Sequence, residues 1–437
     1  MINKILGTAL SRILNAIINL AVIILISRYI GREGYGIIGL VVVAISIIQI
    51  FVDLLGGGAL IYFSPRKNQL ALLVISYLWI LIVLLLFAMA IYIFQDFSPD
   101  LFHRLIPPGE EKSVLVLAAL NAFMLTHYNL LIGKGKIKQY NIVFVVQILS
   151  FISSLIYLLF VARHQDYTSY ISALEISYGV GFALSTVFTI RYFNFGGNLH
   201  PGEIVKEMFS FGLISQIANG FHILNKRISF YFISSMAGLS SLGVYNAGVQ
   251  LSEGLRLIGQ SISLVQFSAI SNSDDRIYAV SLTVKLMKLS VLLTFIGLVV
   301  LLVIPVGAYE YLFTKEFVGI KYIILALSPG VLALSANTIF SHYFSGLGNP
   351  KISLWANIVG FAFTITFALV LIPVLGYLGA ALTASVSYSS TVVYQYFVFK
   401  KQTGVMFRQW LPEKKDFIDF KIIILTLIND KNIEDEH

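Results

Sequence analysis

The chain consists largely of apolar runs long enough to cross a lipid bilayer, and these runs recur from one end to the other. A spanning helix needs roughly 20 apolar residues, because hydrocarbon offers the backbone no water to hydrogen-bond. Of the 437 residues, 57% are hydrophobic and 12% are charged, whereas soluble domains carry about 25% charged residues. The sequence therefore predicts an all-α, polytopic membrane protein.

About twelve transmembrane helices are expected, each near the length that a bilayer requires. The connecting loops are short, and none of them has room for a soluble catalytic domain. The expected spans are residues 6–30, 35–62, 70–94, 113–133, 140–162, 169–192, 208–233, 241–270, 285–306, 321–345, 352–374 and 377–399.

Two pairs of similar segments recur about half a chain apart. "ISRYIGREGYGIIG" from Ile26 resembles "ISSMAGLSSLGVYN" from Ile233, and "LIGKGKIK" from Leu131 resembles "FSGLGNPK" from Phe344. An even number of spans in each half gives parallel repeats, with a binding site where the halves meet. We therefore predict two six-helix lobes, at residues 1–200 and 201–402, followed by a cytoplasmic tail at residues 403–437.

The cations of the loops predict the orientation of the chain. With a cytoplasmic N-terminus, the inner side collects about fourteen Lys and Arg residues and the outer side about seven, and cytoplasmic loops carry the excess. Both termini are therefore expected in the cytoplasm. The tail sequence "FIDFKIIILTLIND" is too short to span and predicts an interfacial or loosely packed helix.

Polar residues form stripes on the opening spans of both halves, at helical spacing. Charge inside a membrane is costly and usually faces a cavity or a partner. A hydrated central cavity is the interpretation we favour, although hydrogen bonds between helices, or snorkelling of Lys226, Arg227 and Arg12, would also explain the stripes. The candidates are Arg12, Asn15 and Asn19 in the first span, Gln216, Asn219, Lys226 and Arg227 in the seventh, and Gln250, Glu253 and Arg256 in the eighth.

Two acidic residues on these stripes leave alternatives open. Glu253 and Arg256 are three residues apart and can neutralise each other. Asp53 is the carboxylate of the first two spans and precedes three glycines that permit a bend. A buried carboxylate can titrate or bind a cation, so Asp53 is the candidate for coupling to Na⁺ or H⁺. A salt bridge to Arg12 or to another cation is the competing interpretation.

Several kinds of chemistry are not expected. The chain has no cysteine, which excludes disulfides and Cys-ligated metals, and no nucleotide-binding or hydrolase motif is present. His127 and His342 each lack a second ligand at helical spacing, so neither a metal nor another cofactor is expected. The net charge of +8 is the charge of cytoplasmic loops and does not indicate nucleic-acid binding.

Three stretches carry a resemblance to a known family. They are "SRILNAIINLAVIILISRYIGREGYGIIGL" near the N-terminus, "GLGNPK" from Gly346, and "VLGYLGAALTASVS" from Val374. These resemble the polysaccharide-transporter branch of the multidrug/oligosaccharidyl-lipid/polysaccharide exporters, which includes the Wzx-type O-antigen and capsule flippases. The resemblance covers roughly residues 4–401.

This resemblance implies two lobes around a cavity in the bacterial inner membrane. It also implies transport of an undecaprenyl-pyrophosphate-linked oligosaccharide to the outer leaflet, without covalent chemistry, beside the glycosyltransferases and polymerase of the same polymer. The cations that match a pyrophosphate-binding cavity are Lys226, Arg227 and Arg256, with Arg12 as a further candidate. They lie mainly in the second half, where Glu253 offsets one of them.

Two other functions remain open at this point. A drug or cation antiporter of the same fold would need an acidic cavity, whereas the stripes carry the cations Arg12, Lys226, Arg227 and Arg256 against the acids Asp53 and Glu253. A membrane enzyme that builds glycans would need sizeable outer loops or acidic motifs. The loops of this chain are short.

Overall fold

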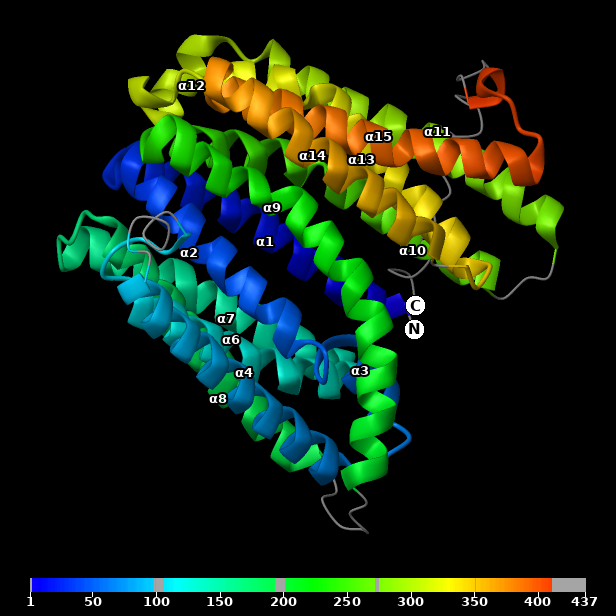
Figure 1. Cartoon of the computed structure of the whole chain (residues 1–437), viewed down its shortest axis with the longest axis horizontal. Coiled ribbons are helices and arrows are strands. Elements are labelled where there is room, and N and C mark those ends of the chain that lie inside the picture. The colour runs from blue at the N-terminus through cyan, green and yellow to red at the C-terminus, as the bar shows by residue number, and fades with distance from the viewer. Residues whose placement is uncertain are drawn as a thin grey trace, which may run out of the picture. The chain divides into compact units, whose positions relative to one another are not determined.

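The computed structural model describes residues 2–97, 99, 105–192, 201–271, 275–349 and 351–410, and these residues form helices and short connections (Figure 1). Two short 3-10 turns, η2 (Lys315–Phe317) and η3 (Phe407–Trp410), and one π turn, η1 (Tyr157–Val161), complete the described elements. The α-helices are α1 (Ile2–Tyr29), α2 (Gly31–Val52), α3 (Gly57–Phe63), α4 (Gln69–Phe97), α6 (Glu111–Gly133), α7 (Ile137–Ile156), α8 (Tyr167–Tyr192), α9 (Pro201–Gly254), α10 (Arg256–Ser271), α11 (Arg276–Val303), α12 (Val306–Phe313), α13 (Ile320–Gly346), α14 (Lys351–Leu375) and α15 (Tyr377–Thr403).

The prediction of an all-α multi-span membrane protein is confirmed. Within the described residues, 9 helical segments are long and apolar enough to cross a membrane. One of these, Asn219–Gln260, contains parts of two predicted spans joined through α9. The first and last predicted spans coincide with α1 and α15. Each of the twelve segments predicted from the sequence therefore overlaps a helix.

Contacts between residues divide the chain into two compact units. The first unit comprises Met1–Gly248, Pro305–Ile323 and Thr366–Ala380. The second comprises Val249–Ile304, Ile324–Ile365 and Ala381–His437. Four of the five boundaries lie inside helices α9, α13, α14 and α15, and the fifth lies between α11 and α12. The division into lobes at residues 200 and 402 remains a prediction, and each unit is described by itself.

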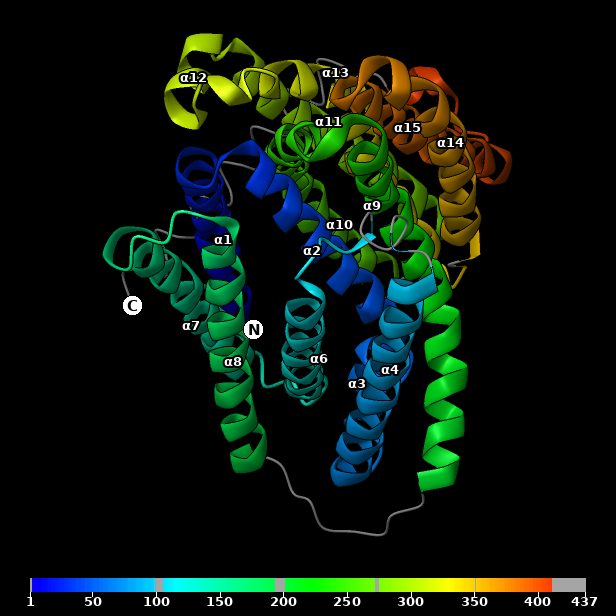
Figure 2. The same cartoon turned by 60° about the vertical axis from the view of Figure 1, so that its left-hand side comes forward.

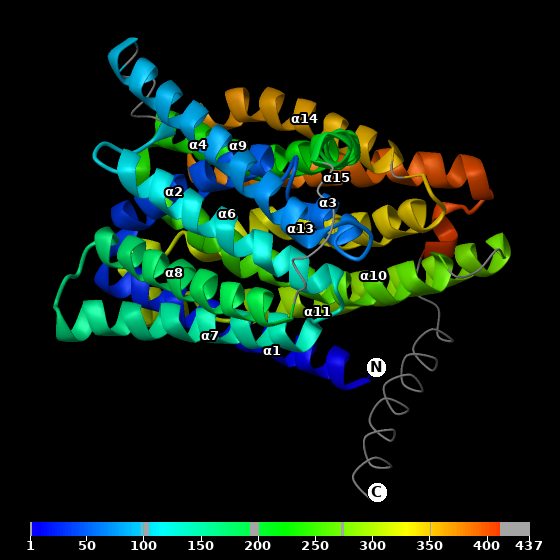
Figure 3. The same cartoon turned by 90° about the horizontal axis from the view of Figure 1, so that it is seen from below.

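In the first unit the helices pack side by side through apolar faces. Helix α6 lies between α8 and α4 (Figure 2), and α7 lies between α1 and α8 (Figure 3). Val114 and Leu117 of α6 are fully buried in a cluster that also contains side chains of α2, α4 and α8. In the second unit, Ile339 and Phe340 of α13 form a similar cluster with Phe399 of α15. Lipid-facing side chains remain exposed.

Three helix breaks or kinks occur at or next to glycine; two lie inside predicted spans and one lies between two of them. The second span divides into α2 and α3, so the bend predicted at the glycine triplet is confirmed: Gly57 has φ +47°. Helix α9 is kinked at Gly238, whose φ is 82° and ψ is 166°. It ends at Gly254, and α10 begins at Arg256. The seventh and eighth spans thus meet at a kink where the sequence predicts a loop.

The glycines of the first repeated segment have equivalent conformations. Gly31 and Gly238 have φ values of 80° and 82°, in the left-handed region that favours glycine. Gly36 and Gly243 pack reciprocally: a Cβ added at Gly36 would lie 2.2 Å from the Leu239 carbonyl oxygen, and one at Gly243 would lie 1.7 Å from the Arg32 carbonyl oxygen. This symmetry supports the repeat predicted from the sequence.

The second repeated segment shows the same correspondence. Gly135 and Gly348 have φ values of 68° and 74°. An added Cβ at Gly133 would lie 2.6 Å from the Ile61 carbonyl oxygen, at the end of the second predicted span. At Gly346 it would lie 2.9 Å from the Ile270 side chain, at the end of the eighth. Within each predicted half, the segment after the fourth span therefore approaches the end of the second span in a similar way.

The ends of the first unit collect the loops that the orientation prediction assigns to one side. Lys67, after α3, forms a 2.8 Å salt bridge with Glu207 near the start of α9. At the opposite ends, the Arg28 guanidinium donates to the Leu312 carbonyl (3.0 Å) and to the Tyr311 carbonyl. The rings of Tyr29 and Phe160 are 4.8 Å apart at this end. Predicted inner and outer loops thus gather at separate ends.

Replacing either glycine of the reciprocal contact should destabilise the protein. Gly36→Ala and Gly243→Ala each place a methyl group against a backbone carbonyl, and overpacking of this kind costs about 1–3 kcal/mol. Thermal unfolding in detergent should show a lower midpoint for both variants. Gly179→Ala is the matched control, since an added Cβ meets nothing within 4 Å there; an equal loss in the control would contradict this role of the glycine contact.

Candidate functional site

Asp53 lies at the C-terminal end of α2, where it is half-buried. Gln49, one helical turn earlier, donates a 2.8 Å hydrogen bond from Nε2 to Asp53 Oδ1. The Nδ2 group of Asn121 in α6 in turn donates to Gln49 Oε1 at 3.1 Å. The carboxylate is therefore held by a chain of neutral amides that joins α2 to α6. The predicted salt bridge to Arg12 is not tested, because the side chain of Arg12 lies outside the described residues.

Helix α9 brings two more of the predicted polar residues to Asp53. The point where a Cβ would lie on Gly57 is 3.2 Å from both Asp53 Cγ and Gln216 Nε2. Asn219 donates from Nδ2 to Gln216 Oε1 at 3.1 Å. This approach depends on Gly212, where an added Cβ would lie 1.8 Å from the Leu54 carbonyl oxygen. Stripe residues of the second and seventh spans thus meet in the first unit.

A small cavity of about 160 Å³ continues this polar region. It is lined by Ser46 and Gln49 of α2, Asn121 of α6, Tyr178 of α8 and Ile223 of α9, together with Val42 and Ile45. Ile223 is four residues after Asn219 and four before Arg227, so these positions share one face of α9. The cavity therefore lies beside the polar stripe predicted from the sequence.

The two adjacent cations of α9, Lys226 and Arg227, are packed among neighbouring side chains. Lys226 is 9% exposed, and it follows a buried Asn225. Arg227 is half-buried, and its Cζ lies 5.1 Å from the centre of the Phe230 ring, which is the geometry of a cation–π contact. Gly39 of α2 lies against the same ring, since its added Cβ would be 3.4 Å from Phe230. Both cations thus lie within a packed part of the first unit.

The remaining stripe residues are distributed over both units. Asn15 of α1 is half-buried, and Asn19 is exposed. In the second unit, Gln250 is exposed and Arg256 is half-buried at the first residue of α10. Glu253 accepts a 2.8 Å hydrogen bond from the Tyr388 hydroxyl of α15. The structure thus gives Glu253 a neutral partner far along the chain, which the sequence spacing to Arg256 did not indicate.

A buried histidine with three hydroxyl partners is a further polar feature, and the sequence did not reveal these partners. His127 is 1% exposed. Its Nε2 lies 2.6 Å from the Tyr77 hydroxyl and 3.1 Å from the Thr186 hydroxyl, and its Nδ1 lies 2.8 Å from the Thr189 hydroxyl. These partners come from α4 and α8, too far along the chain for any spacing rule. Among the described residues, no group of three His, Asp or Glu side chains is arranged to hold a metal.

The helical fold, with polar groups within its apolar spans, is that of a multi-pass membrane protein. Solved structures with this fold include the lipid II flippase MurJ in an inward closed conformation, with a TM-score of 0.72 at 18% identity over 98% of this chain and 93% of that one. An inward-facing multidrug transporter of the MATE family and MOP superfamily gives 0.71 at 16% identity, over 88% and 93%. These likenesses show the fold.

The family is shown by sequence. A family model described as "Polysaccharide biosynthesis protein" matches residues 1–258 and 255–422. The chain belongs to this family of polysaccharide biosynthesis proteins. An uncharacterised membrane protein of Methanocaldococcus jannaschii is 24% identical over 277 residues, which are 61% of this chain and 55% of that protein. The chain thus matches about half of the length of that relative.

Removing the Gln49 amide, which lies between Asp53 and Asn121 in the hydrogen-bond network, should destabilise the first unit. Gln49→Leu deprives Asp53 of a donor and Asn121 of an acceptor, and leaving buried polar groups unpaired costs about 1–3 kcal/mol each. Asn121→Leu removes one of these bonds and should cost less. Thermal unfolding midpoints should fall in that order, with the exposed Asn19→Leu as control. Equal midpoints for Gln49→Leu and the control would rule out a structural role for the amide chain.

Proposed function

We propose that this transporter is a flippase for an undecaprenyl-pyrophosphate-linked oligosaccharide. Its cargo would be the repeat unit of an O-antigen, capsule or exopolysaccharide, moved from the cytoplasmic to the outer leaflet of the bacterial inner membrane. The observation that carries the proposal is the pair Lys226 and Arg227, buried and half-buried within an apolar segment of α9. Membership of the polysaccharide biosynthesis family supports it.

The chemistry of these cations suits an anionic head group. A charge at the centre of a spanning helix costs about 2.5–3.5 kcal/mol on insertion scales, so such residues are usually functional. The arginine fork can donate two hydrogen bonds to a phosphate, whereas lysine acts as a point charge. We assign cargo binding to Arg227, Arg256 and Lys226, with Arg12 as an additional cation. Neutral stripe residues, among them Gln216, Asn219 and Gln250, would contact the sugars.

The proposed cycle needs no covalent step. The lipid tail remains in the bilayer while the charged head group passes through a cavity formed by the two predicted lobes. Glycosyltransferases would supply the lipid-linked unit on the cytoplasmic side, and a polymerase would use it on the other side. The half-buried Asp53, with its amide partners and neighbouring glycines, is the group that we assign to coupling with Na⁺ or H⁺.

The proposed orientation places both termini in the cytoplasm. Single cysteines at Lys136 and Lys351, introduced into this cysteine-free chain, should react with an impermeant thiol reagent only from the cytoplasm. Cysteines at Asp166 and Lys315 should react from outside. The opposite pattern would reverse the orientation and place the start of transport on the other side.

A drug or cation antiporter is the second candidate, and its support is the likeness of the fold to a multidrug transporter of the MATE family. Such a function requires a cavity with acidic character. Loss of Arg227 would then leave export of cationic drugs intact. A chain that protects cells from cationic drugs but does not assemble surface glycan would favour this alternative.

The two arginines should be required for glycan assembly independently of protein abundance. Arg227→Ala and Arg256→Ala should each lower surface glycan about tenfold or more, because a hydrogen bond to a charged group contributes about 1.5–3 kcal/mol. Arg227→Lys should restore only part of it, and Arg227→Glu should be worse than alanine. Polymer is measured by gel and membrane abundance by immunoblot, with the exposed Arg163→Ala as control. Activity that falls only in step with abundance would assign these cations to helix packing.

Asp53→Asn should separate coupling from binding. The amide keeps an oxygen to accept from Gln49 but removes the charge, so gradient-driven transport should fall while binding of the lipid-linked cargo persists. Gradient-driven transport is measured in proteoliposomes with and without an ion gradient. Cargo binding is measured at equilibrium in detergent. Unchanged gradient-driven transport at normal protein level would remove Asp53 from the mechanism.

A further inference from the structure

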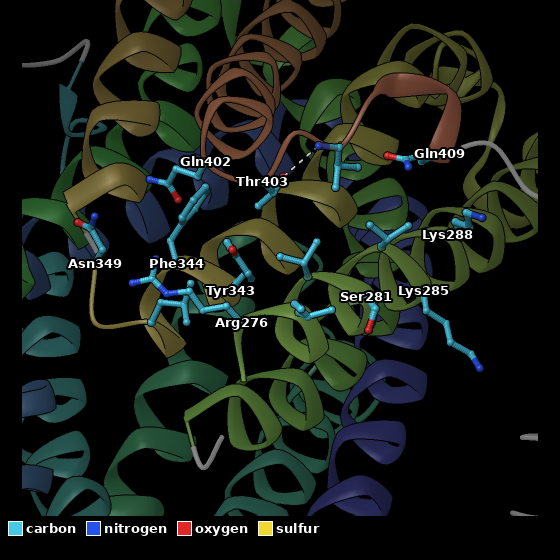
Figure 4. Close-up of a pocket in the computed structure, with 15 residues that line it drawn as sticks. Arg276, Ser281, Lys285, Lys288, Tyr343, Phe344, Asn349, Gln402, Thr403 and Gln409 are labelled. Carbon is cyan, nitrogen blue, oxygen red and sulfur yellow. Dashed lines mark hydrogen bonds between the residues drawn. The ribbon is translucent and has the colours of Figure 1, made fainter. Parts of the chain in front are cut away.

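A basic pocket of about 880 Å³ lies in the second unit, away from the residues assigned to cargo binding. Three cations of α11 line it: Arg276, Lys285 and Lys288. In Figure 4, Arg276 lies on one side near Asn349, and the two lysines lie on the other. Among the described residues that line the pocket, none is acidic. Its charge therefore suits an anion.

A second pocket, of about 560 Å³, adjoins the first and is almost entirely apolar. Lys288 lines both pockets, so they meet at this residue. Other lining residues include Val291, Leu292 and Phe295 of α11, and Leu332 of α13. Phe295 is 52% exposed on the surface that the apolar spans present to lipid. A basic site is therefore continuous with an apolar one that hydrocarbon can reach.

The 3-10 turn η3 lies between the two pockets with a different face toward each. Gln409 lines the basic pocket, while Phe407 and Trp410 line the apolar one. The turn is held by a 2.9 Å hydrogen bond from the Met406 backbone N–H to Gln409 Oε1. The Trp410 ring packs 5.4 Å from the Phe340 ring, centre to centre. The polar and apolar sites are thus built by one ordered turn.

The two lysines lie inside α11, several turns after its first residue. Lys285 and Lys288 lie about 13 and 18 Å along the helix axis beyond Arg276, at 1.5 Å per residue. Lys288 is 9% exposed and lines both pockets, and a lysine can bury its aliphatic stem along an apolar surface while its charge stays in a polar environment. Basic pockets between spanning helices on the cytoplasmic side are suited to anionic lipid head groups.

We infer that these two pockets together bind one anionic phospholipid of the surrounding membrane, with its phosphate at Lys285 and Lys288 and an acyl chain in the apolar pocket. A resident phospholipid fits better than the transported lipid because the site lies within one unit and includes none of the residues assigned to cargo. It fits better than free phosphate because one of the two pockets is almost entirely apolar. The inference is independent of the proposed cargo.

The native Trp410 provides the test, because brominated acyl chains quench tryptophan fluorescence on contact. A chain with Trp79→Phe and Trp355→Phe keeps Trp410, and a second with Trp79→Phe and Trp410→Phe keeps Trp355, which is 56% exposed. Each full-length chain is reconstituted into phosphatidylcholine vesicles containing brominated phosphatidylglycerol or brominated phosphatidylcholine at equal mole fraction. Trp410 should be quenched more by the anionic lipid, and Trp355 equally by both.

The lysine variants connect this preference to the pocket. Lys285→Gln with Lys288→Gln should remove the preference at Trp410, by about fivefold for each lysine, without changing quenching at Trp355. Lys134→Gln with Lys136→Gln, the same charge change between α6 and α7, should leave it intact. Equal quenching of Trp410 by both lipids, or a preference that survives the loss of both lysines, would overturn the inference.

Competition distinguishes the sources of the phosphate. Unbrominated phosphatidylglycerol should restore Trp410 fluorescence, whereas inorganic phosphate and undecaprenyl phosphate at the same concentration should not. Restoration by inorganic phosphate would reduce the site to an anion site, and preferential restoration by undecaprenyl phosphate would make it a cargo site. Either result would overturn the assignment to a resident phospholipid. Neither affects the proposed flippase function, which the Arg227 variants test separately.

Discussion

The close approach of helices at glycine is the contact on which the first unit depends. Backbone groups within hydrocarbon must be satisfied internally, so the spans are helical, and helices approach closely only where side chains are small. Gly36 and Gly243 supply such a contact reciprocally, each facing a carbonyl of the other repeated segment. Gly212 gives α9 a similar approach to Leu54, at the break between α2 and α3. The polar residues at Asp53 meet because these backbones are close.

Inside the spans, several polar side chains have neutral hydrogen-bond partners. Asp53 accepts from an amide, and that amide accepts from another. His127 contacts three hydroxyls from two other helices, and Glu253 accepts from the Tyr388 hydroxyl. These neutral partners stabilise buried groups without a counter-charge. Arg227, with its charge over the ring of Phe230, differs from them, and the proposed function assigns its charge to the cargo.

Two kinds of basic site follow from this arrangement, and their surroundings separate them. Lys226 and Arg227 lie among packed helices of the first unit, where a charge is costly and a passing anion would be transient cargo. Lys285 and Lys288 line a basic pocket, and Lys288 also lines the adjoining apolar pocket, where a lipid chain could be held. The same residue types are thus proposed to bind transported cargo in one place and a resident lipid in another. The experiments on Arg227 and on Trp410 address them independently.

Sequence alone determined that the chain lies in a membrane, that it is helical, roughly where its spans lie, and that two pairs of segments repeat. Each of these properties is encoded in the length of apolar runs or in residues at a fixed offset. It also placed Asp53, Gln216 and Asn219 on polar faces, since helical periodicity decides which residues share a side. Tertiary structure alone decided which faces meet. Asn121, Tyr388 and the partners of His127 lie tens of residues or more from the groups they contact, and no periodicity connects different helices. The basic pocket could not be predicted either, because in the sequence its lysines indicate only the orientation of the chain. The pocket exists because α13, α15 and η3 pack beside α11.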